Sequence, residues 1–275
     1  MVDGRKRARL DIALTQRKMT ASRSQSESFI RLGKVTVDGR VINKPGHFVD
    51  ANSDIKLLAD VQYVSRAGLK LASVADILKL NFTGKIVLDV GSSTGGFTDY
   101  ALRHGAKKVY AIDVGTEQLH PSLRGDKRIE LHEKTDIRNV FVNATEINHL
   151  LPTTNYPLND IPDIVVIDVS FISLRDILPH IHDNLSGDNT QIVAMVKPQF
   201  ETHKSNPSIN SGFRNSRTDE NVLNKGIIKN DAMRRQILRD FEDWSKKYFV
   251  ILAKRDSDVA GSKGNQERFY LLSRL

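Results

Sequence analysis

The pattern of hydrophobic and polar positions divides the chain into two units. Residues 1–60 hold short periodic segments separated by turn residues, whereas residues 65–275 alternate apolar runs of strand length with segments of helical spacing. We therefore predict a small α+β domain over 1–60, a linker at 61–64 and a large domain over 65–275. Residues 202–224 are rich in Ser, Asn, Arg and Lys and almost free of apolar residues, which predicts a mobile insertion.

The small unit begins with two predicted helices, which short strands follow. The segment RLDIALTQRKM (9–19) has the apolar spacing of an amphipathic helix. The segment SRSQSESFIRLGKV predicts a second helix, which Ser22 or Ser24 can cap and Gly33 can end. The segment KVTVDGRVI alternates around Asp-Gly, which is a strong hairpin signal, and DIKLL predicts a further short strand.

The large unit has the pattern of an α/β fold with a mostly parallel sheet. Helical stretches separate most of its strand candidates, as in a doubly wound sheet. The last two candidates are joined by RDSDVAGSKGNQE, which is too short for a helical crossover, so this pair should be antiparallel. A Rossmann-like sheet with an antiparallel last strand is typical of class I S-adenosylmethionine-dependent methyltransferases. The six candidates are Lys85–Val90, Lys108–Asp113, Asp163–Val169, Gln191–Val196, Phe249–Lys254 and Arg268–Ser273.

Charge and composition narrow the classes of function. The formal net charge is +8 and the pI is about 9.6, and residues 1–60 carry 12 Lys and Arg against 7 Asp and Glu, a net charge of +5. This bias favours a polyanion partner and a nucleic-acid-binding module at the N-terminus. Cysteine is absent, which excludes disulfides, thiolate metal sites and cysteine nucleophiles, and we expect no metal site. No apolar run suits a membrane span and no secretory signal is visible, so a cytoplasmic protein is the simplest interpretation.

The stretch KIVLDVGSSTGGFTDY (85–100) places a glycine-rich turn directly after an apolar strand. A Walker loop requires a lysine after the glycines, where Phe97 stands, and a dinucleotide fingerprint requires a G-x-G-x-x-G spacing that is missing here. The remaining candidate is S-adenosylmethionine, whose amino-acid and ribose portions the backbone of this turn can approach. Asp89, at the end of the strand, can accept from its α-ammonium group.

Two later carboxylates favour the same ligand. Asp113 ends the next strand and can accept both ribose hydroxyls, and Asp136 in KTDIRN is placed to meet the adenine amino group. A single turn of this kind would be equally well explained as a capped helix N-terminus, but three carboxylates in this order favour a cofactor site. We expect S-adenosyl-L-methionine to be held by Asp89, Gly91, Ser92, Thr94, Gly95, Gly96, Phe97, Asp113 and Asp136.

Four side chains with acid–base chemistry are expected at one edge of the sheet. Asp168 follows an apolar strand, and Lys197 ends the next strand before a proline, so both lie where parallel strands end and ligands bind. Lysine is rarely buried without a partner, and Asp168 is the expected one. Lys70 on the first helix of the large domain and Glu267 at the start of the antiparallel strand can reach the same edge. Taken singly, each of these two is equally well explained as an ordinary structural residue.

The motifs of the large unit together resemble the TlyA (hemolysin A) family of ribosomal RNA 2′-O-methyltransferases. The resemblance rests on YVSRAGLKL, LDVGSSTGGFTD, AIDVG, IDVSFISL, MVKPQFE and KGNQERFYLL. RLD, SRSQSESFIRLGKVTVDG and PGHFVDANSDIKL resemble the S4 RNA-binding domain. The family is related to FtsJ-type methyltransferases, whose catalytic Lys-Asp-Lys-Glu set falls on Lys70, Asp168, Lys197 and Glu267. The chain departs from the family in its expanded 202–224 segment and in VAGSKGNQE, where a proline-containing version is common.

The resemblance implies methyl transfer from S-adenosyl-L-methionine to the ribose 2′-hydroxyl of cytidine in ribosomal RNA, with an assembled ribosomal subunit as partner. Lys197 would either accept the hydroxyl proton or orient the hydroxyl, and both roles stay open. Basic residues would hold RNA phosphates, with an affinity that falls as salt rises; we expect no DNA or membrane partner. These residues are Arg7, Arg9, Arg23, Arg31, Lys34 and Arg66.

Three alternatives remain at this point. A membrane-damaging protein is suggested by the hemolysin name, but neither a signal peptide nor a membrane-seeking amphipathic stretch is visible. A ribosome-binding or assembly factor with an inactive site is the second alternative. The third is an enzyme of the same fold that acts on a base or on another RNA.

Overall fold

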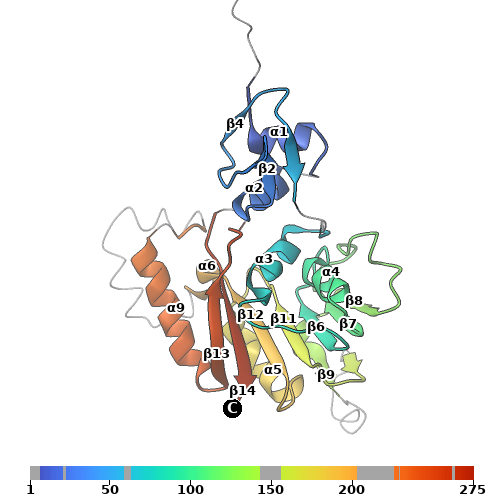
Figure 1. Ribbon diagram of the computed structural model, residues 1–275. Helices are drawn as coiled ribbons and strands as arrows, with labels where there is room; N and C mark the ends of the chain where they lie inside the picture. The colour runs from blue at the N-terminus through green and yellow to red at the C-terminus, as the bar shows by residue number, and fades with distance from the viewer. Residues whose placement is uncertain are drawn as a thin grey trace, which may run out of the picture.

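The computed structural model describes residues 7–20, 23–58, 63–142, 156–202, 226–228, 230–261 and 264–275. The predicted insertion at 202–224 falls outside these ranges except for Thr202, as do residues 1–6 and the first half of the predicted linker. Figure 1 shows a small N-terminal module on top of a larger α/β domain.

The N-terminal module contains the two helices and the hairpin that the sequence predicts. Leu10 and Phe29 have no exposed surface, because the apolar stripes of both helices face its core. Gly33, at a φ of +67°, follows the second helix, and Asp38 and Gly39 turn the hairpin with positive φ values of 50° and 79°. The elements are β1 (Ala8–Arg9), α1 (Leu10–Gln16), α2 (Arg23–Arg31), β2 (Val35–Val37), β3 (Arg40–Val41), β4 (Phe48–Val49) and β5 (Ile55–Leu57).

The large domain is built on a seven-stranded sheet with the order β13-β14-β12-β11-β6-β7-β8. β14 is antiparallel to both of its neighbours and the other pairs are parallel, so the predicted antiparallel last strand is confirmed. The strands are β6 (Ile86–Val90), β7 (Lys108–Ile112), β8 (Ile129–His132), β11 (Ile164–Ile167), β12 (Gln191–Val196), β13 (Phe249–Asp256) and β14 (Arg268–Arg274). β9 (Val140–Val142) and β10 (Tyr156–Leu158) form a separate parallel pair.

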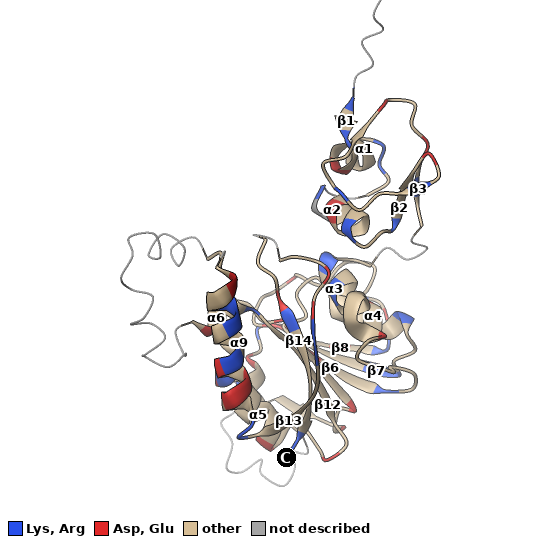
Figure 2. Ribbon diagram, turned by 60° about the vertical axis from the view of Figure 1, so that its left-hand side comes forward, with Lys and Arg blue, Asp and Glu red and all other residues tan. Residues whose placement is uncertain are grey.

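Helices cover both faces of this sheet and give three layers. One hydrophobic cluster joins a face of the sheet to α3 (Arg66–Ala75) and α4 (Gly96–Arg103), and a second joins the other face to α5 (Leu178–Asn184) and α9 (Asp231–Ser245). The outer surface of α9 carries charged residues of both signs (Figure 2). Short helical turns are η1 (Ile137–Asn139), η3 (Leu174–Asp176) and α6 (Pro198–Glu201). Within the described ranges, no helix is both long and apolar enough to cross a bilayer.

The N-terminal module lies over the edge at which the parallel strands end (Figure 1). Its core side chains and those of α3 and α4 belong to one continuous hydrophobic cluster. Tyr63 and Val64, which the sequence assigns to the linker, already pack on the large domain. The Tyr63 ring lies 5.4 Å from that of Tyr100, and the Val64 amide donates to Asp99 Oδ2 at 2.9 Å.

Candidate active site

Two lysine–carboxylate ion pairs lie at the carboxyl edge of the sheet. Lys197 Nζ lies 2.6 Å from Asp168 Oδ1, and Lys70 Nζ lies 2.6 Å from Glu267 Oε2. All four side chains are largely buried, and such charges are tolerated only when they are paired. The pairs adjoin because the β12–β14 register sets Val196 opposite Arg268, so that the residues next to these face each other at the same edge. The structure thus brings together the four residues that the sequence predicts.

Each lysine is placed by the element that carries it. Lys197 ends β12 because Pro198 cannot continue the strand ladder and instead begins α6. Lys70 lies on the buried side of α3, which approaches α4 closely at Gly68. A Cβ at Gly68 would lie 2.9 Å from the carbonyl oxygen of Gly96, so a larger residue would push the two helices apart.

The structure places two further polar residues at this edge, which the sequence analysis did not identify. Ser170 Oγ accepts from Lys197 Nζ at 2.7 Å, and its position two residues after Asp168 puts it at the same end of β11. Glu201 is buried on α6 and accepts from Ser173 Oγ at 2.7 Å and from the Leu174 amide at 2.8 Å. Glu201 therefore ties the segment after Asp168 to the segment after Lys197.

Asp89 is a buried carboxylate with one oxygen in use. Thr98 Oγ1 donates to Asp89 Oδ2 at 2.6 Å, whereas Oδ1 is buried and has no partner among the described residues. Burial, followed by the nearby charge of Asp168, raises the pKa of Asp89 to about 7, against the hydrogen bond from Thr98. A cationic ligand group such as an α-ammonium would give Oδ1 the partner that it lacks and would stabilise the ionised form.

Two adjoining cavities of about 140 and 390 Å³ lie beside Asp89 and the Lys197–Asp168 pair. The smaller cavity is lined by Asp89, Ser92, Thr94, Phe97 and Lys197, and the larger by Asp113 and Asp136. Their walls share Gly91, Ser93, Asp168 and Ser170. The larger volume lies in the range of small-molecule sites. Asp89, which lines the smaller cavity and has one unpartnered oxygen, suits the α-ammonium group that S-adenosylmethionine carries. The residues present therefore fit this cofactor.

Asp113 and Asp136 line the larger cavity, but both also have local partners. Asp113 accepts from the Gly115 amide at 2.7 Å and from the Ser93 amide at 2.8 Å, which leaves each oxygen one further acceptor position. Asp136 receives two side-chain hydrogen bonds from Arg138, at 2.9 and 2.6 Å, which lower the pKa of Asp136. Their contacts with a ribose and an adenine remain predictions.

The glycines of the turn have distinct surroundings. Gly91, at a φ of +80°, packs against the end of β11, where an added Cβ would lie 3.0 Å from the Asp168 carbonyl oxygen. Gly95, at a φ of +88°, faces Leu119, and Gly96 faces α3. Neither of these two lines the cavities, so they shape the turn through packing.

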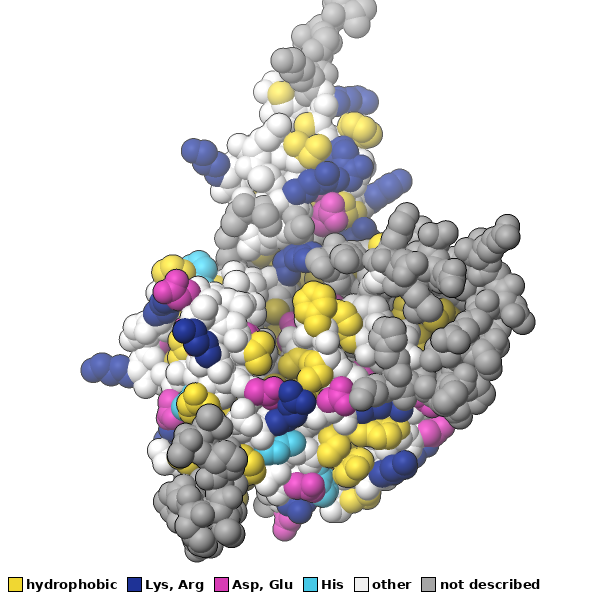
Figure 3. All heavy atoms as spheres, turned by 180° about the vertical axis from the view of Figure 1, so that it is seen from behind, with side chains coloured by type: hydrophobic (Ala, Val, Ile, Leu, Met, Phe, Trp, Pro, Cys, Tyr) yellow, Lys and Arg dark blue, Asp and Glu magenta, His cyan; other side chains and the backbone are white. Residues whose placement is uncertain are grey.

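The predicted RNA-binding residues are spread over the N-terminal module and the start of α3. Arg7, Arg9 and Arg23 keep side-chain exposures of 69%, 40% and 54% although each forms an ion pair. Arg31 and Lys34 are exposed, and Arg66 is half-buried as the first residue of α3. Figure 3 shows Lys and Arg side chains projecting from the module above an apolar area of the large domain. A cavity of about 520 Å³ between these units is lined by Arg31, Asn43 and Asp258, among others.

Comparison with known proteins decides the family. A model of FtsJ-like methyltransferases matches residues 63–274, and a model of the S4 domain matches residues 8–55. The chain belongs to the FtsJ-like methyltransferase family. It is 39% identical to "Hemolysin A" of Brachyspira hyodysenteriae over 80% of this chain and 87% of that protein. It is 37% identical to "16S/23S rRNA (cytidine-2'-O)-methyltransferase TlyA" of Mycobacterium tuberculosis over 72% and 70% of the two chains.

Solved structures place this FtsJ-like chain in the same fold. A putative hemolysin from Streptococcus thermophilus is 30% identical and superimposes with a TM-score of 0.62 over 98% of this chain and 88% of that one. A putative hemolysin from Lactococcus lactis is 33% identical, also with a TM-score of 0.62, over 78% of this chain and 89% of that one. The first of these matches extends over both the S4 and the methyltransferase domains.

Proposed function

We propose that this FtsJ-like methyltransferase transfers a methyl group from S-adenosyl-L-methionine to the ribose 2′-hydroxyl of cytidine in ribosomal RNA. The observation that carries the proposal is the Lys197–Asp168–Ser170 contact, which borders the same cavity as the half-partnered Asp89. The name of the Mycobacterium tuberculosis relative supports the substrate, and the S4 domain supports an RNA partner.

The cofactor would be held at the glycine turn and at the ends of β6 and β7. Asp89 would accept the α-ammonium group, Asp113 the ribose hydroxyls, and Asp136 the adenine amino group. When bound, S-adenosyl-L-methionine supplies an electrophilic methyl group. Ser92, Thr94 and Phe97 line the inner wall of this site, and Phe97 packs on Phe269 with ring centroids 6.1 Å apart.

Lys197 would act on the ribose 2′-hydroxyl. An ammonium group has three donors, and Asp168 and Ser170 engage two of them, so one direction remains for the hydroxyl. As an ammonium group Lys197 donates to the oxygen and orients it. It could take the hydroxyl proton only as a neutral amine, which would become the ammonium group as the oxygen gains the methyl group. Lys70 and Glu267, paired with each other next to Lys197, would fix this arrangement by packing and charge.

The N-terminal module would deliver the RNA to this edge. It carries Arg7, Arg9, Arg23, Arg31 and Lys34, and it lies over the ends of the parallel strands (Figure 1). The reacting nucleotide would leave its stack so that its ribose reaches the cavity. An assembled ribosomal subunit as substrate would place the reaction in the cytoplasm.

The proposal is tested by mapping ribose methylation on ribosomal RNA from cells with and without the gene. We expect one or more cytidine 2′-O-methyl groups to be lost without the gene and restored by the wild-type chain. Naked ribosomal RNA and purified subunits from the deletion cells, compared as methyl acceptors, would identify the physiological substrate. Unchanged methylation maps would contradict the proposal and favour a non-catalytic ribosome-binding factor.

Lys197→Ala separates binding from chemistry. We expect this variant to lose methyl transfer by about 10²-fold or more and to keep its affinity for the cofactor, because Lys197 acts on the hydroxyl. Transfer of a labelled methyl group to RNA and calorimetric titration with S-adenosyl-L-methionine measure the two properties. Retained turnover would remove Lys197 from this role.

A further inference from the structure

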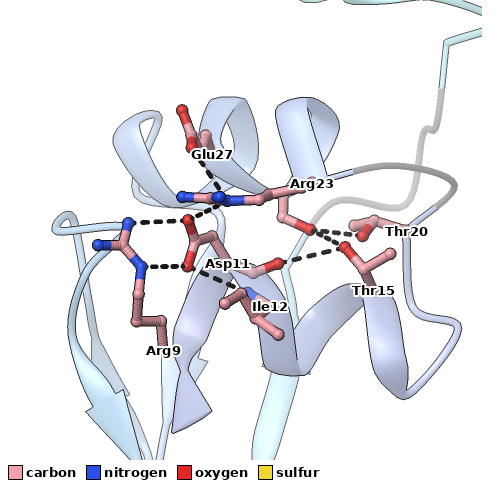
Figure 4. A network of polar contacts seen from close by, with 8 residues as sticks. Arg9, Asp11, Ile12, Thr15, Thr20, Arg23 and Glu27 are labelled. Atoms are coloured by element: carbon pink, nitrogen blue, oxygen red, sulfur yellow. Dashed lines mark hydrogen bonds and ion pairs between the residues drawn. The ribbon is translucent and has the colours of Figure 1, made fainter.

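Asp11 is a fully buried carboxylate within the basic N-terminal module (Figure 4). Arg9 donates to it twice, from Nε to Oδ1 at 3.0 Å and from Nη2 to Oδ2 at 2.9 Å. Arg23 Nε donates to Oδ2 at 2.8 Å. Arg9 ends β1 and Arg23 begins α2, so one carboxylate holds side chains from two separate segments.

Further hydrogen bonds hold Asp11 and the start of α1 in place. The Ile12 amide donates to Asp11 Oδ1 at 3.1 Å, and Thr15 Oγ1 donates to the Asp11 carbonyl oxygen at 3.2 Å. The hydroxyl of Ser26 contacts those of Thr15 and Thr20 at 3.2 and 2.6 Å, which joins α1 to α2. Burial would raise the pKa of Asp11, but the hydrogen bonds from Arg9 and Arg23 outweigh it and lower the pKa below its usual range.

The two guanidinium groups use only part of their donor sets on Asp11. Neither Nη atom of Arg23 nor Nη1 of Arg9 has a hydrogen-bond partner in the part of the chain that the structure describes. Their side chains are 40% and 54% exposed, although the carboxylate between them is covered. Guanidinium forks match the geometry of phosphate oxygens, and here two of them are fixed side by side.

We propose that Asp11 holds Arg9 and Arg23 as a preformed clamp for a phosphate of the RNA backbone, an inference that rests on the proposed RNA-binding role of this module. Glu27 Oε1 also lies 3.5 Å from Arg23 Nε, so the two guanidinium groups stand beside two carboxylates and the group has no net charge. The open Nη donors, rather than a net charge, would bind the phosphate oxygens. Because the arginines are ordered when the protein folds, RNA binding does not have to order them. Asp11 is thus a positioning residue that acts through its two partners.

Simple electrostatics and the clamp predict opposite changes in RNA affinity when the charge of Asp11 is removed. A carboxylate near an RNA site repels phosphates, so its neutralisation alone would tighten binding. In a preformed clamp, Asp11→Asn instead loosens the two arginines and weakens binding even though the net charge of the protein rises by one. The direction of the change therefore distinguishes the two accounts.

The experiment measures the affinity of the full-length chain for a labelled 20-nucleotide RNA of mixed sequence and for purified ribosomal RNA, at several salt concentrations. We expect Asp11→Asn to weaken binding about tenfold. The matched control is Asp50→Asn, which removes the same charge from the exposed Arg7–Asp50 pair of the same module. This control should bind as tightly as the wild type or more tightly. Wild-type or tighter binding by Asp11→Asn would overturn the clamp.

Two charge-conserving variants keep the proposal falsifiable if Asp11→Asn unfolds the module. Arg9→Lys and Arg23→Lys retain the positive charge but lose the fork, and both positions are partly exposed, so the fold should persist, as thermal unfolding can verify. We expect each variant to bind RNA several-fold more weakly, and its effect to shrink in the Asp11→Asn background. Wild-type affinity in both lysine variants would refute the clamp.

A kinetic readout separates the clamp from the proposed function. With ribosomal RNA as acceptor, Asp11→Asn should raise the KM for RNA about tenfold and leave kcat unchanged. An equal fall in kcat would indicate a general structural role for Asp11 and count against the clamp. If the wild-type chain itself bound no RNA, the RNA-binding function would fail; if it bound RNA in a salt-dependent way and Asp11→Asn matched it, only the clamp would fail.

Discussion

Asp89 shows how a binding residue can lower the stability of the protein that carries it. Its carboxylate is buried with one unpartnered oxygen, and burial raises its pKa from 3.8 to about 7. A raised carboxyl pKa means that the folded state holds the proton more tightly than the unfolded state. The stabilisation is therefore full below about pH 4 and is lost as the pH rises toward 7. Above that pH the ionised carboxylate keeps the hydrogen bond from Thr98, but its other oxygen has no partner among the described residues until a cationic ligand binds.

Asp89→Asn should separate stability from binding. The neutral amide removes the buried charge, so we expect the ligand-free variant to be more stable than the wild type at pH 8, by roughly 2–4 kcal/mol, and to gain less than half as much at pH 5. The same change should weaken S-adenosyl-L-methionine binding, because the α-ammonium loses its counter-charge. Urea unfolding at both pH values and calorimetric titration check the two effects. A variant that is less stable at pH 8, or that binds the cofactor normally, would contradict this account.

At the scale of elements, the positions of α3 and α4 depend on glycines where the two helices touch. A Cβ at Gly96 would clash with Ser65 Oγ and would lie 2.7 Å from Ala67 Cβ, and these atoms belong to the start of α3. α3 carries Lys70 and α4 begins directly after the cofactor turn. The spacing of these helices therefore affects both the position of Lys70 and the position of the cofactor turn.

We expect Gly96→Ala to destabilise the protein by about 1–3 kcal/mol through overpacking and to reduce methyl transfer, because Lys70 shifts relative to Glu267. The control is Gly125→Ala, where an added Cβ meets nothing within 4 Å. Chemical denaturation and transfer rates of the two variants give the comparison. Equal stability of both variants would show that the helices can move apart without cost.

Strands whose ends carry a strong local signal, such as a proline, could be predicted from the sequence, whereas strands with polar residues in their apolar run could not. β12 was predicted to the residue, because its apolar run stops at Lys197 before a proline. β8 was missed because it lies at the sheet edge, and its half-buried Glu130 and His132 break the apolar run. The strand ends predicted the Lys197–Asp168 pair, whereas no local pattern reports that Lys70 pairs with Glu267. The sequence did not single out Asp11, because its pairing depends on arginines from β1 and α2.

At the scale of the whole molecule, the N-terminal module and the β13–β14 turn enclose a gap over the active edge. Arg31 lines this gap from the module, and Asp258 and Gln266 line it from the large domain. Gln266 directly precedes Glu267, so RNA held in the gap would lie next to the candidate catalytic set.

Arg31→Glu should therefore impair RNA use without affecting the cofactor. We expect the KM for ribosomal RNA to rise about tenfold at low salt, with a smaller difference at high salt, because a phosphate contact becomes a repulsion. The control is Lys246→Glu, which makes the same charge change at the C-terminal end of α9, far from the gap (Figure 1). Steady-state methylation at two salt concentrations and titration with S-adenosyl-L-methionine provide the test. Equal effects of both variants would mean that only net charge matters.

The apolar cluster that runs without a break from the N-terminal module into α3 and α4 has a consequence for target choice. Because this cluster joins the module to the large domain, the distance between the RNA-binding surface of the module and the active edge is fixed. The site at which the module binds RNA therefore sets how far away the reacting ribose must lie. A nucleotide at a different distance from the phosphates that the module binds would not be methylated, even in a favourable local sequence. Three-dimensional RNA architecture, more than base order, would then decide which cytidine is modified.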